Sequence, residues 1–306
     1  MNFKATQPTE DYIRVTAVAL SEGCREMCPH CALNLLPNGP KMKFSDLKTI
    51  TESDLKFDEG RVILSYGAPF SYYDKMESGE KNLSHAVSLL IEEKGVSNVF
   101  IWTSALHPGS SLEQAAVDGL SKHSGKIDVG LSFDLFREEA GQYIARIGQT
   151  AKMLKKAGIP VSFVNIVYSI ENEKETKAAL KGLDSALKPY GGLNGIPSDV
   201  IQVIRLGRAE GITKHEIRCV DPKCSLKLKP FVGGGLVLYP KGELGVCFSA
   251  FGHYTPRVAN ALVDSQQEVV KKYRAYVALL DSHMAKKPRD VERCRWHMAM
   301  GSRATA

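Results

Sequence analysis

The chain has 306 residues, of which 43% are hydrophobic and 24% are charged, and its formal net charge is +6. This length and composition fit one large globular domain, or one domain with a smaller appended piece, and exclude a disordered or collagen-like chain. Seven cysteines are too few for a disulfide scaffold and odd in number, so we expect reduced thiols and a cytoplasmic protein. No apolar run approaches the roughly 20 residues of a membrane helix, and no signal-peptide segment is visible, so no membrane partner is expected.

Residues 12 to 207 alternate short β-branched runs with helical patterns, which is typical of repeated β-α units. Six strands are predicted, mostly as continuous apolar runs that indicate burial on both faces of a parallel sheet. These strands span residues 12–20, 61–66, 98–104, 127–133, 160–168 and 199–206. The clearest helices span residues 82–94, 111–121, 138–157 and 171–187. Six units are too few for a closed eight-stranded barrel, so we expect an α/β fold with a partial (β/α)6 barrel.

The pattern changes after Gly207, and we place a domain boundary near residue 212. Residues 236–239 and 244–248 predict a β-hairpin whose turn contains a proline and a glycine. A helix at about residues 265–284 and a basic tail follow. The expected organisation is therefore a barrel over residues 1–211 and a small α+β cap over residues 212–306.

Three cysteines follow the first predicted strand at the spacing C-x3-C-x2-C: Cys24, Cys28 and Cys31. Thiolates so close in sequence can wrap one soft metal centre. On a four-iron cluster, three sulfur ligands leave one iron open to a cofactor or substrate. The alternative is a zinc site with His30 or a distant cysteine as the fourth ligand.

This motif, on the first loop of a six-unit partial barrel, resembles the cluster motif of the radical SAM enzymes, and the resemblance covers roughly residues 12–210. It implies a 4Fe-4S cluster held by Cys24, Cys28 and Cys31, with S-adenosylmethionine (SAM) bound to the open iron. It also implies a one-electron reductant such as flavodoxin or ferredoxin. The 5′-deoxyadenosyl radical released from SAM would then abstract hydrogen from a substrate carbon.

Further cofactor-binding positions are implied by the same resemblance. His30 takes the place of the residue that lies near the adenine in the family. The Gly-Gly-Glu-Pro run that ends the second strand of the family is Tyr66-Gly67-Ala68-Pro69 here, so the expected acidic contact is missing at Ala68. Tyr66 and Gly67 are therefore expected to contact the cofactor through the backbone.

Four polar residues near the ends of later strands complete the expected cofactor site. Ser132 and Asp134 resemble the Ser-x-Asp run of the family and are expected to face one side of the fourth strand, toward the ribose or the methionine moiety. Asn165 lies inside an apolar strand, where a buried amide needs partners. Arg205 lies near the end of the sixth predicted strand and is expected to pair with the cofactor carboxylate in bidentate fashion. For all four, a satisfied polar residue at a strand end is the alternative.

The remaining cysteines all follow the barrel: Cys219, Cys224, Cys247 and Cys294. Gly242 and Cys247 resemble the Gly-x4-Cys hairpin of SPASM and twitch extensions, which implies a second iron-sulfur cluster. The gap of 17 residues between Cys224 and Gly242 is longer than the gap usual in these extensions, and Cys294 alone stands for the closing cysteines. If Cys247 is not a cluster ligand, its thiol is a candidate hydrogen donor to a substrate radical.

The reaction expected from these features is isomerisation or epimerisation of a biosynthetic intermediate, with a small molecule or peptide as the substrate. Dehydrogenation and other peptide tailoring are close alternatives. Basic residues in the cap leave a nucleotide, or a hypermodified base in DNA or RNA, as a second class of substrate. A zinc-bearing or cluster-bearing structural protein that has lost cofactor binding is the non-enzymatic alternative.

Overall fold

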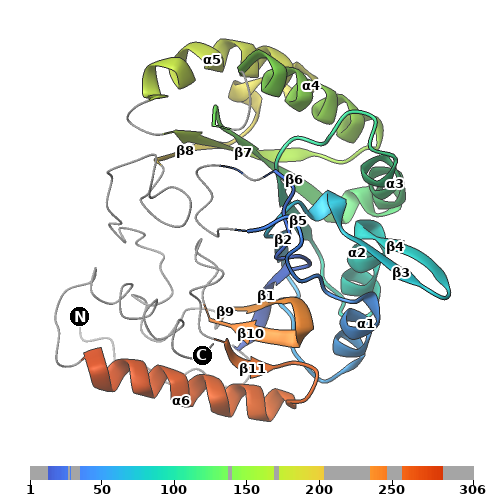
Figure 1. Cartoon of the computed structure of the whole chain (residues 1–306), viewed down its shortest axis with the longest axis vertical. Helices are drawn as coiled ribbons and strands as arrows, with labels where there is room; N and C mark the ends of the chain where they lie inside the picture. Colours follow the sequence, from blue (N-terminus) through green and yellow to red (C-terminus); the bar gives the residue numbers. More distant parts are fainter. Residues whose placement is uncertain are drawn as a thin grey trace.

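A computed structural model describes residues 13–26, 28, 35–136, 140–168, 172–202, 235–246 and 257–284. Six parallel strands form one side of a curved sheet, as Figure 1 shows. They are β1 (Arg14–Ala19), β2 (Val62–Ser65), β5 (Val99–Thr103), β6 (Ile127–Phe133), β7 (Val161–Tyr168) and, at the edge of the described sheet, β8 (Ser198–Gln202). Each pairs in parallel with the next in that order. All six predicted strands and the partial (β/α)6 barrel are confirmed.

Five helices cover the outer side of this sheet in Figure 1: α1 (Phe44–Glu52), α2 (Leu83–Glu92), α3 (Ser111–Leu120), α4 (Ala140–Lys156) and α5 (Glu173–Ala186). Their apolar faces and the strands form one large buried core. Local signals fix their ends. The side chain of Asn82 caps α2, and α4 ends in two lysines before Gly158, which has a φ of 72°.

The C-terminal region extends the same sheet. The predicted hairpin is present as β9 (Gly235–Leu238) and β10 (Glu243–Gly245), joined by a turn at Pro240–Gly242 and followed by β11 (Arg257–Asn260). β9 pairs in parallel with β1, so the sheet has nine strands among the described residues. The predicted boundary at residue 212 lies outside the described residues.

The last described helix, α6 (Gln266–Met284), packs against β11 and lies below it in Figure 1. The buried side chain of Gln266 accepts a hydrogen bond from the Lys56 N–H at 3.1 Å and donates one to the Ile13 carbonyl at 3.1 Å. Val270 and Tyr273 enter the main core. The predicted cap residues therefore share their core with the barrel.

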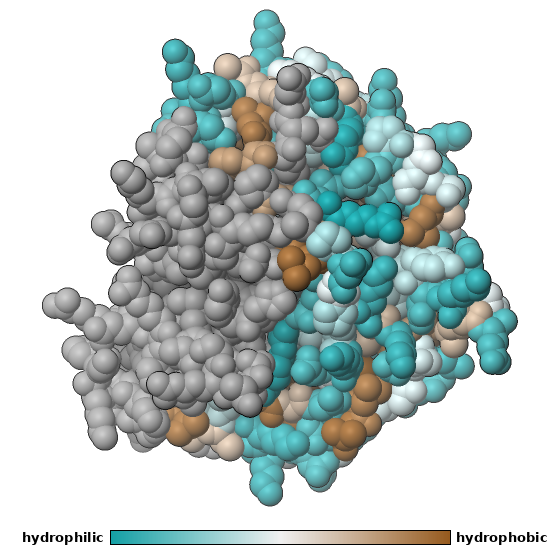
Figure 2. Space-filling view, in the orientation of Figure 1, coloured by the Kyte–Doolittle hydropathy of each residue, from teal (hydrophilic) through white to brown (hydrophobic). Residues whose placement is uncertain are grey.

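A two-stranded hairpin, β3 (Tyr73–Met76) and β4 (Gly79–Asn82), projects from the body between β2 and α2 in Figure 1. The sequence analysis did not predict it, because its polar residues lack an alternating apolar pattern. The described face of the molecule is mostly hydrophilic in Figure 2. None of the helices in the described ranges is long and apolar enough to span a bilayer.

Candidate functional site

The inner face of the curved sheet is closed at its amino-terminal end. Arg61 donates two hydrogen bonds to Asp128, at 2.9 and 2.8 Å, and its guanidinium lies 4.5 Å from the ring centre of Phe100. The Phe100 ring packs directly on Gly130. A Cβ at position 130 would lie 2.4 Å from the Phe100 ring, so a larger residue there would displace the ring. A ligand on the inner face is therefore expected at the carboxyl end of the strands, where (β/α) barrels place their active sites.

Polar side chains follow above this floor. The Trp102 indole donates to the Ser132 hydroxyl at 2.8 Å and packs against the Phe163 ring at a centroid distance of 5.6 Å. Ser132 and Asn165 are register partners on β6 and β7, so they lie side by side on one face. The Asn165 Oδ1 atom is buried and has no hydrogen-bond partner among the described residues. A buried amide oxygen without a partner fits a site that a ligand donor completes.

Asp134 behaves differently from its expected partner Ser132. It is fully buried, and its carboxylate accepts a hydrogen bond from the Phe136 N–H at 3.1 Å, as in a turn after the strand. Its role toward a cofactor stays a prediction.

The loop after β1 carries the first two cysteines of the motif, and both are buried. The Cys24 N–H donates to the Leu36 carbonyl at 2.9 Å, and the Glu22 N–H donates to the Pro40 carbonyl at 2.8 Å. Gly39 packs so closely on Glu22 that a Cβ would lie 2.2 Å from its carbonyl oxygen. Residues 36–41, which we call the returning chain, therefore hold the start of the loop after β1 in place. We call that loop, residues 20–28, the cysteine loop.

Glu26, between the two cysteines, anchors the loop to two other elements. Its carboxylate, 5% exposed, lies 3.1 Å from Arg146 of α4 and 3.0 Å from Nε2 of His107. Arg146 also donates to the Ala105 carbonyl at 2.8 Å. The sequence analysis missed this anchor, because nothing local pairs Glu26 with a residue 120 positions away.

The end of β2 contacts the cysteine loop directly. Gly67 has a φ of 60°, and a Cβ there would lie 2.4 Å from the Gly23 carbonyl oxygen. Only glycine meets both conditions without strain. This contact ties Gly67, predicted from the sequence as a cofactor-binding residue, to the base of the cysteine loop.

Tyr66 adopts a φ of 71°, which is uncommon for a residue other than glycine. Its buried hydroxyl lies 2.9 Å from the Tyr239 hydroxyl on the far side of β1. Arg257 of β11 stacks over the Tyr239 ring at 3.1 Å, and its Nη2 lies 2.7 Å from Glu22. The C-terminal strands are thus joined to β2 through the two tyrosines and to the start of the cysteine loop through Arg257 and Glu22.

The remaining predicted site residues lie outside the described residues. They are His30, Cys31, Arg205, Cys219, Cys224, Cys247 and Cys294. Among the described residues no three His, Cys, Asp or Glu side chains are grouped as metal ligands. Cys24 and Cys28 are buried and form no disulfide within the described ranges, and thiols are the ligands that soft metals prefer.

No protein-family model matches the sequence, and no curated protein matches it. Among solved structures, anSMEcpe with bound AdoMet and the Cp18Cys peptide is 13% identical, with a TM-score of 0.55, covering 87% of this chain and 83% of its own. SuiB of Streptococcus suis, solved bound to the precursor peptide SuiA, is 14% identical with a TM-score of 0.56. That match covers 86% of this chain and 65% of SuiB. The chain therefore has the partial-barrel fold of these radical SAM structures.

Proposed function

We propose that the chain is a radical SAM enzyme. The observation that carries the proposal is the pair of buried cysteines, Cys24 and Cys28, in the loop after β1, on a fold similar to that of a protein solved with bound AdoMet. Cys31 completes the motif in the sequence. When bound, the 4Fe-4S cluster and SAM supply a 5′-deoxyadenosyl radical that abstracts hydrogen from a substrate carbon.

The residues of the chain have distinct roles in this proposal. The three cysteines hold the cluster. Asn165 offers an unpartnered buried oxygen to a donor of SAM, and Ser132 retains its hydroxyl proton for donation while it accepts from Trp102. The rings of Phe100 and Trp102, which contact each other at a centroid distance of 5.6 Å, give the inner face an apolar surface, and such a surface favours the exclusion of water from a reactive intermediate.

The remaining predicted cofactor contacts complete the proposed site. His30 would lie near the adenine, and Arg205 would pair with the SAM carboxylate. The backbone after β2, at Tyr66 and Gly67, replaces the missing acidic contact, and both residues adopt a left-handed φ, of 71° and 60°.

For the substrate we propose a peptide, and for the reaction an epimerisation or isomerisation. Both neighbouring structures were solved with a bound peptide, which favours a peptide over a free small molecule. We also keep the proposal of a second iron-sulfur cluster on Cys219, Cys224, Cys247 and Cys294, with the Cys247 thiol as hydrogen donor if it is not a ligand.

Anaerobic reconstitution with iron and sulfide tests the proposed function. Dithionite-reduced protein is expected to convert SAM to 5′-deoxyadenosine, Cys28→Ala to abolish this conversion, and Cys247→Ala to spare it. Chromatography of the deoxyadenosine product measures the outcome. Binding of zinc without iron and sulfide, or conversion that survives Cys28→Ala, contradicts the proposal.

Iron analysis tests the second cluster separately. Two four-iron clusters require about eight irons per chain, and one requires about four. We expect the higher value, and a drop to about four irons in Cys247→Ala. An unchanged iron content in that variant removes Cys247 from the ligand set.

A further inference from the structure

A cavity lies beside the cysteine loop. It has a volume of about 500 Å³, within the range of small-ligand sites. Three segments line it: the cysteine loop with its returning chain, the segment after β2, and the loop from β5 to α3. None of the inner-face residues Phe100, Trp102, Ser132 and Asn165 lines it. Its lining includes the cysteine loop and Ala68, so the cavity adjoins the proposed SAM site on the side away from those residues.

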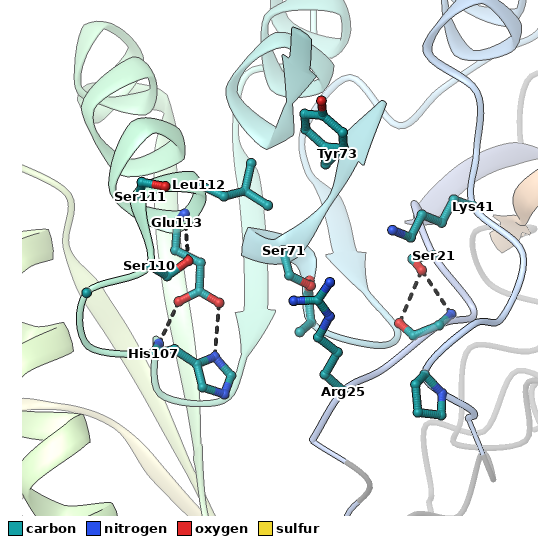
Figure 3. A pocket seen from close by; sticks show the side chains of 14 residues that line it. Ser21, Arg25, Lys41, Ser71, Tyr73, His107, Ser110, Ser111, Leu112 and Glu113 are labelled. Carbon is teal, nitrogen blue, oxygen red and sulfur yellow. Dashed lines mark hydrogen bonds and ion pairs between the residues drawn. The ribbon is translucent and has the colours of Figure 1, made fainter. Parts of the chain in front are cut away.

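Two cations extend into this cavity in Figure 3, Arg25 from the cysteine loop and Lys41 from the returning chain. Both side chains are exposed, and neither forms an ion pair with any residue in the described part of the chain. Since the cations lack acidic partners there, the cavity carries an uncompensated positive charge.

The acidic residue of the lining does not neutralise these cations. The Glu113 carboxylate accepts from the His107 N–H at 2.6 Å and contacts His107 Nδ1 at 3.1 Å. This side chain is 5% exposed, and Figure 3 shows it turned to His107 on the opposite side of the cavity from Lys41. Ser110, which caps α3, brings the positive end of that helix to the same wall.

Apolar groups form the rest of the lining. Pro37, Ala68 and Leu112 contribute aliphatic surface. Tyr73 contributes its ring, because its hydroxyl donates to Glu80 at 2.9 Å. An inorganic anion would leave these surfaces uncovered, whereas a ligand with an apolar stem and an anionic end would contact both the walls and the cations.

We propose that this cavity binds a carboxylate on an apolar stem, such as the acidic side chain of a peptide. Charge-assisted hydrogen bonds from Arg25 and Lys41 would hold the carboxylate. Arg25 lies between Cys24 and Cys28, so a ligand there contacts the cysteine loop itself. The proposal concerns binding and holds whether or not the protein cleaves SAM.

The test uses the full chain, reconstituted anaerobically, and two capped tripeptides, Ala-Glu-Ala and Ala-Gln-Ala. These probes differ in one charge, and saturation-transfer NMR measures the Kd of each. We expect the glutamate peptide to bind at least about tenfold more tightly than the glutamine peptide, and added salt to weaken it. Equal affinities of the two peptides on the unmodified protein, or no binding of either, overturn the proposal.

Variants locate the binding. Lys41→Gln is expected to weaken the glutamate peptide about tenfold, and Arg25→Gln by a similar factor. Lys174→Gln removes the same charge from exposed α5, far along the chain, and is the matched control that should leave the Kd unchanged. Equal effects of Lys41→Gln and Lys174→Gln contradict the assignment.

Two further measurements separate the sources of failure. An Ala-phosphoserine-Ala peptide that binds where the glutamate peptide does not would identify a phosphate site and overturn the carboxylate. The 5′-deoxyadenosine assay is run on the same samples. Cleavage without peptide binding contradicts only the cavity, and peptide binding without cleavage contradicts only the proposed enzyme.

Discussion

Replacing Gly67 or Gly95 by alanine measures how much the close contact between β2 and the cysteine loop restricts the residue at position 67. The two glycines have φ values of 60° and 66°, but only Gly67 has a backbone atom in the space of a Cβ. Gly95→Ala should cost about 1–2 kcal/mol of unfolding free energy, from the left-handed backbone alone. Gly67→Ala should cost about 3 kcal/mol or more, because a steric clash with Gly23 adds to this strain.

Urea unfolding of both variants gives the comparison, with iron incorporation as a second readout. We expect Gly67→Ala also to bind less iron than Gly95→Ala, since the clash displaces the base of the cysteine loop. Equal losses of stability in the two variants would show that the loop moves aside at no cost.

Arg146 carries the second prediction at the residue scale. Replacement by alanine leaves the buried Glu26 carboxylate without its guanidinium partner, and the expected loss is about 3 kcal/mol. Denaturant unfolding measures it. Lys177→Ala breaks an exposed pair with Glu173 on α5 and is the control, expected to change stability far less. A similar small effect of both variants would mean that Glu26 does not hold the loop.

The cysteine spacing could be recognised from the sequence because all three cysteines of the motif lie within eight consecutive residues. The contacts that hold the cysteine loop in place could not be recognised from the sequence. Glu26, Arg146 and His107 come together only after the β-α units are stacked, and charged residues in a sequence carry no sign of their partners. Likewise, the fully buried Asp134 and the unpartnered Asn165 are both polar residues near strand ends, and only the fold distinguishes them.

Among the helices and strands, those buried most completely in the structure were the ones that the sequence predicted best. Strands buried on both faces are continuous apolar runs, so their positions were predicted within a few residues. The elements that were missed are short or polar: α1, the β3–β4 hairpin and β11. α1 begins at Phe44 after Lys43, whose side chain makes no cap, so the sequence lacks a start signal there.

The tyrosine pair tests how β2 and β9 are joined across β1. Tyr239→Phe removes one hydroxyl and leaves the buried Tyr66 hydroxyl without it, which should cost about 1–2 kcal/mol. Tyr73→Phe on the projecting β3–β4 hairpin removes an exposed hydrogen bond to Glu80 and should have little effect. Thermal unfolding distinguishes the two variants. A negligible loss in Tyr239→Phe would show that the hydroxyl pair does not stabilise the junction.

At the scale of the whole molecule, the sequence predicted the strands of the C-terminal hairpin but not their partner. An alternating or apolar run indicates a strand, and nothing in it identifies the neighbouring strand. β9 pairs with β1, which lies about 220 residues earlier, so a cap predicted as a separate piece shares one sheet with the barrel. Arg257 and Gln266 add polar contacts to Glu22 and Ile13 across the same junction.

A chain that ends at residue 211 tests this arrangement. The truncation removes Leu236, Val237, Leu238 and Tyr239, all fully buried, and exposes the edge of β1. Each buried side chain of this size contributes about 1.5–3 kcal/mol, and a domain is stable by only about 5–15 kcal/mol in total. We therefore expect the shortened chain to lose cooperative unfolding and to aggregate through the exposed strand edge.

Calorimetry and hydrogen exchange measure the outcome. In the full chain, amides of β1, paired on both sides, should exchange far more slowly than those of the projecting β3–β4 hairpin. In the shortened chain this protection of β1 should be lost. A shortened chain with an unchanged melting temperature and slow exchange in β1 would instead establish residues 1–211 as an independent domain, and the pairing of β9 with β1 would then be a docking contact rather than part of the fold.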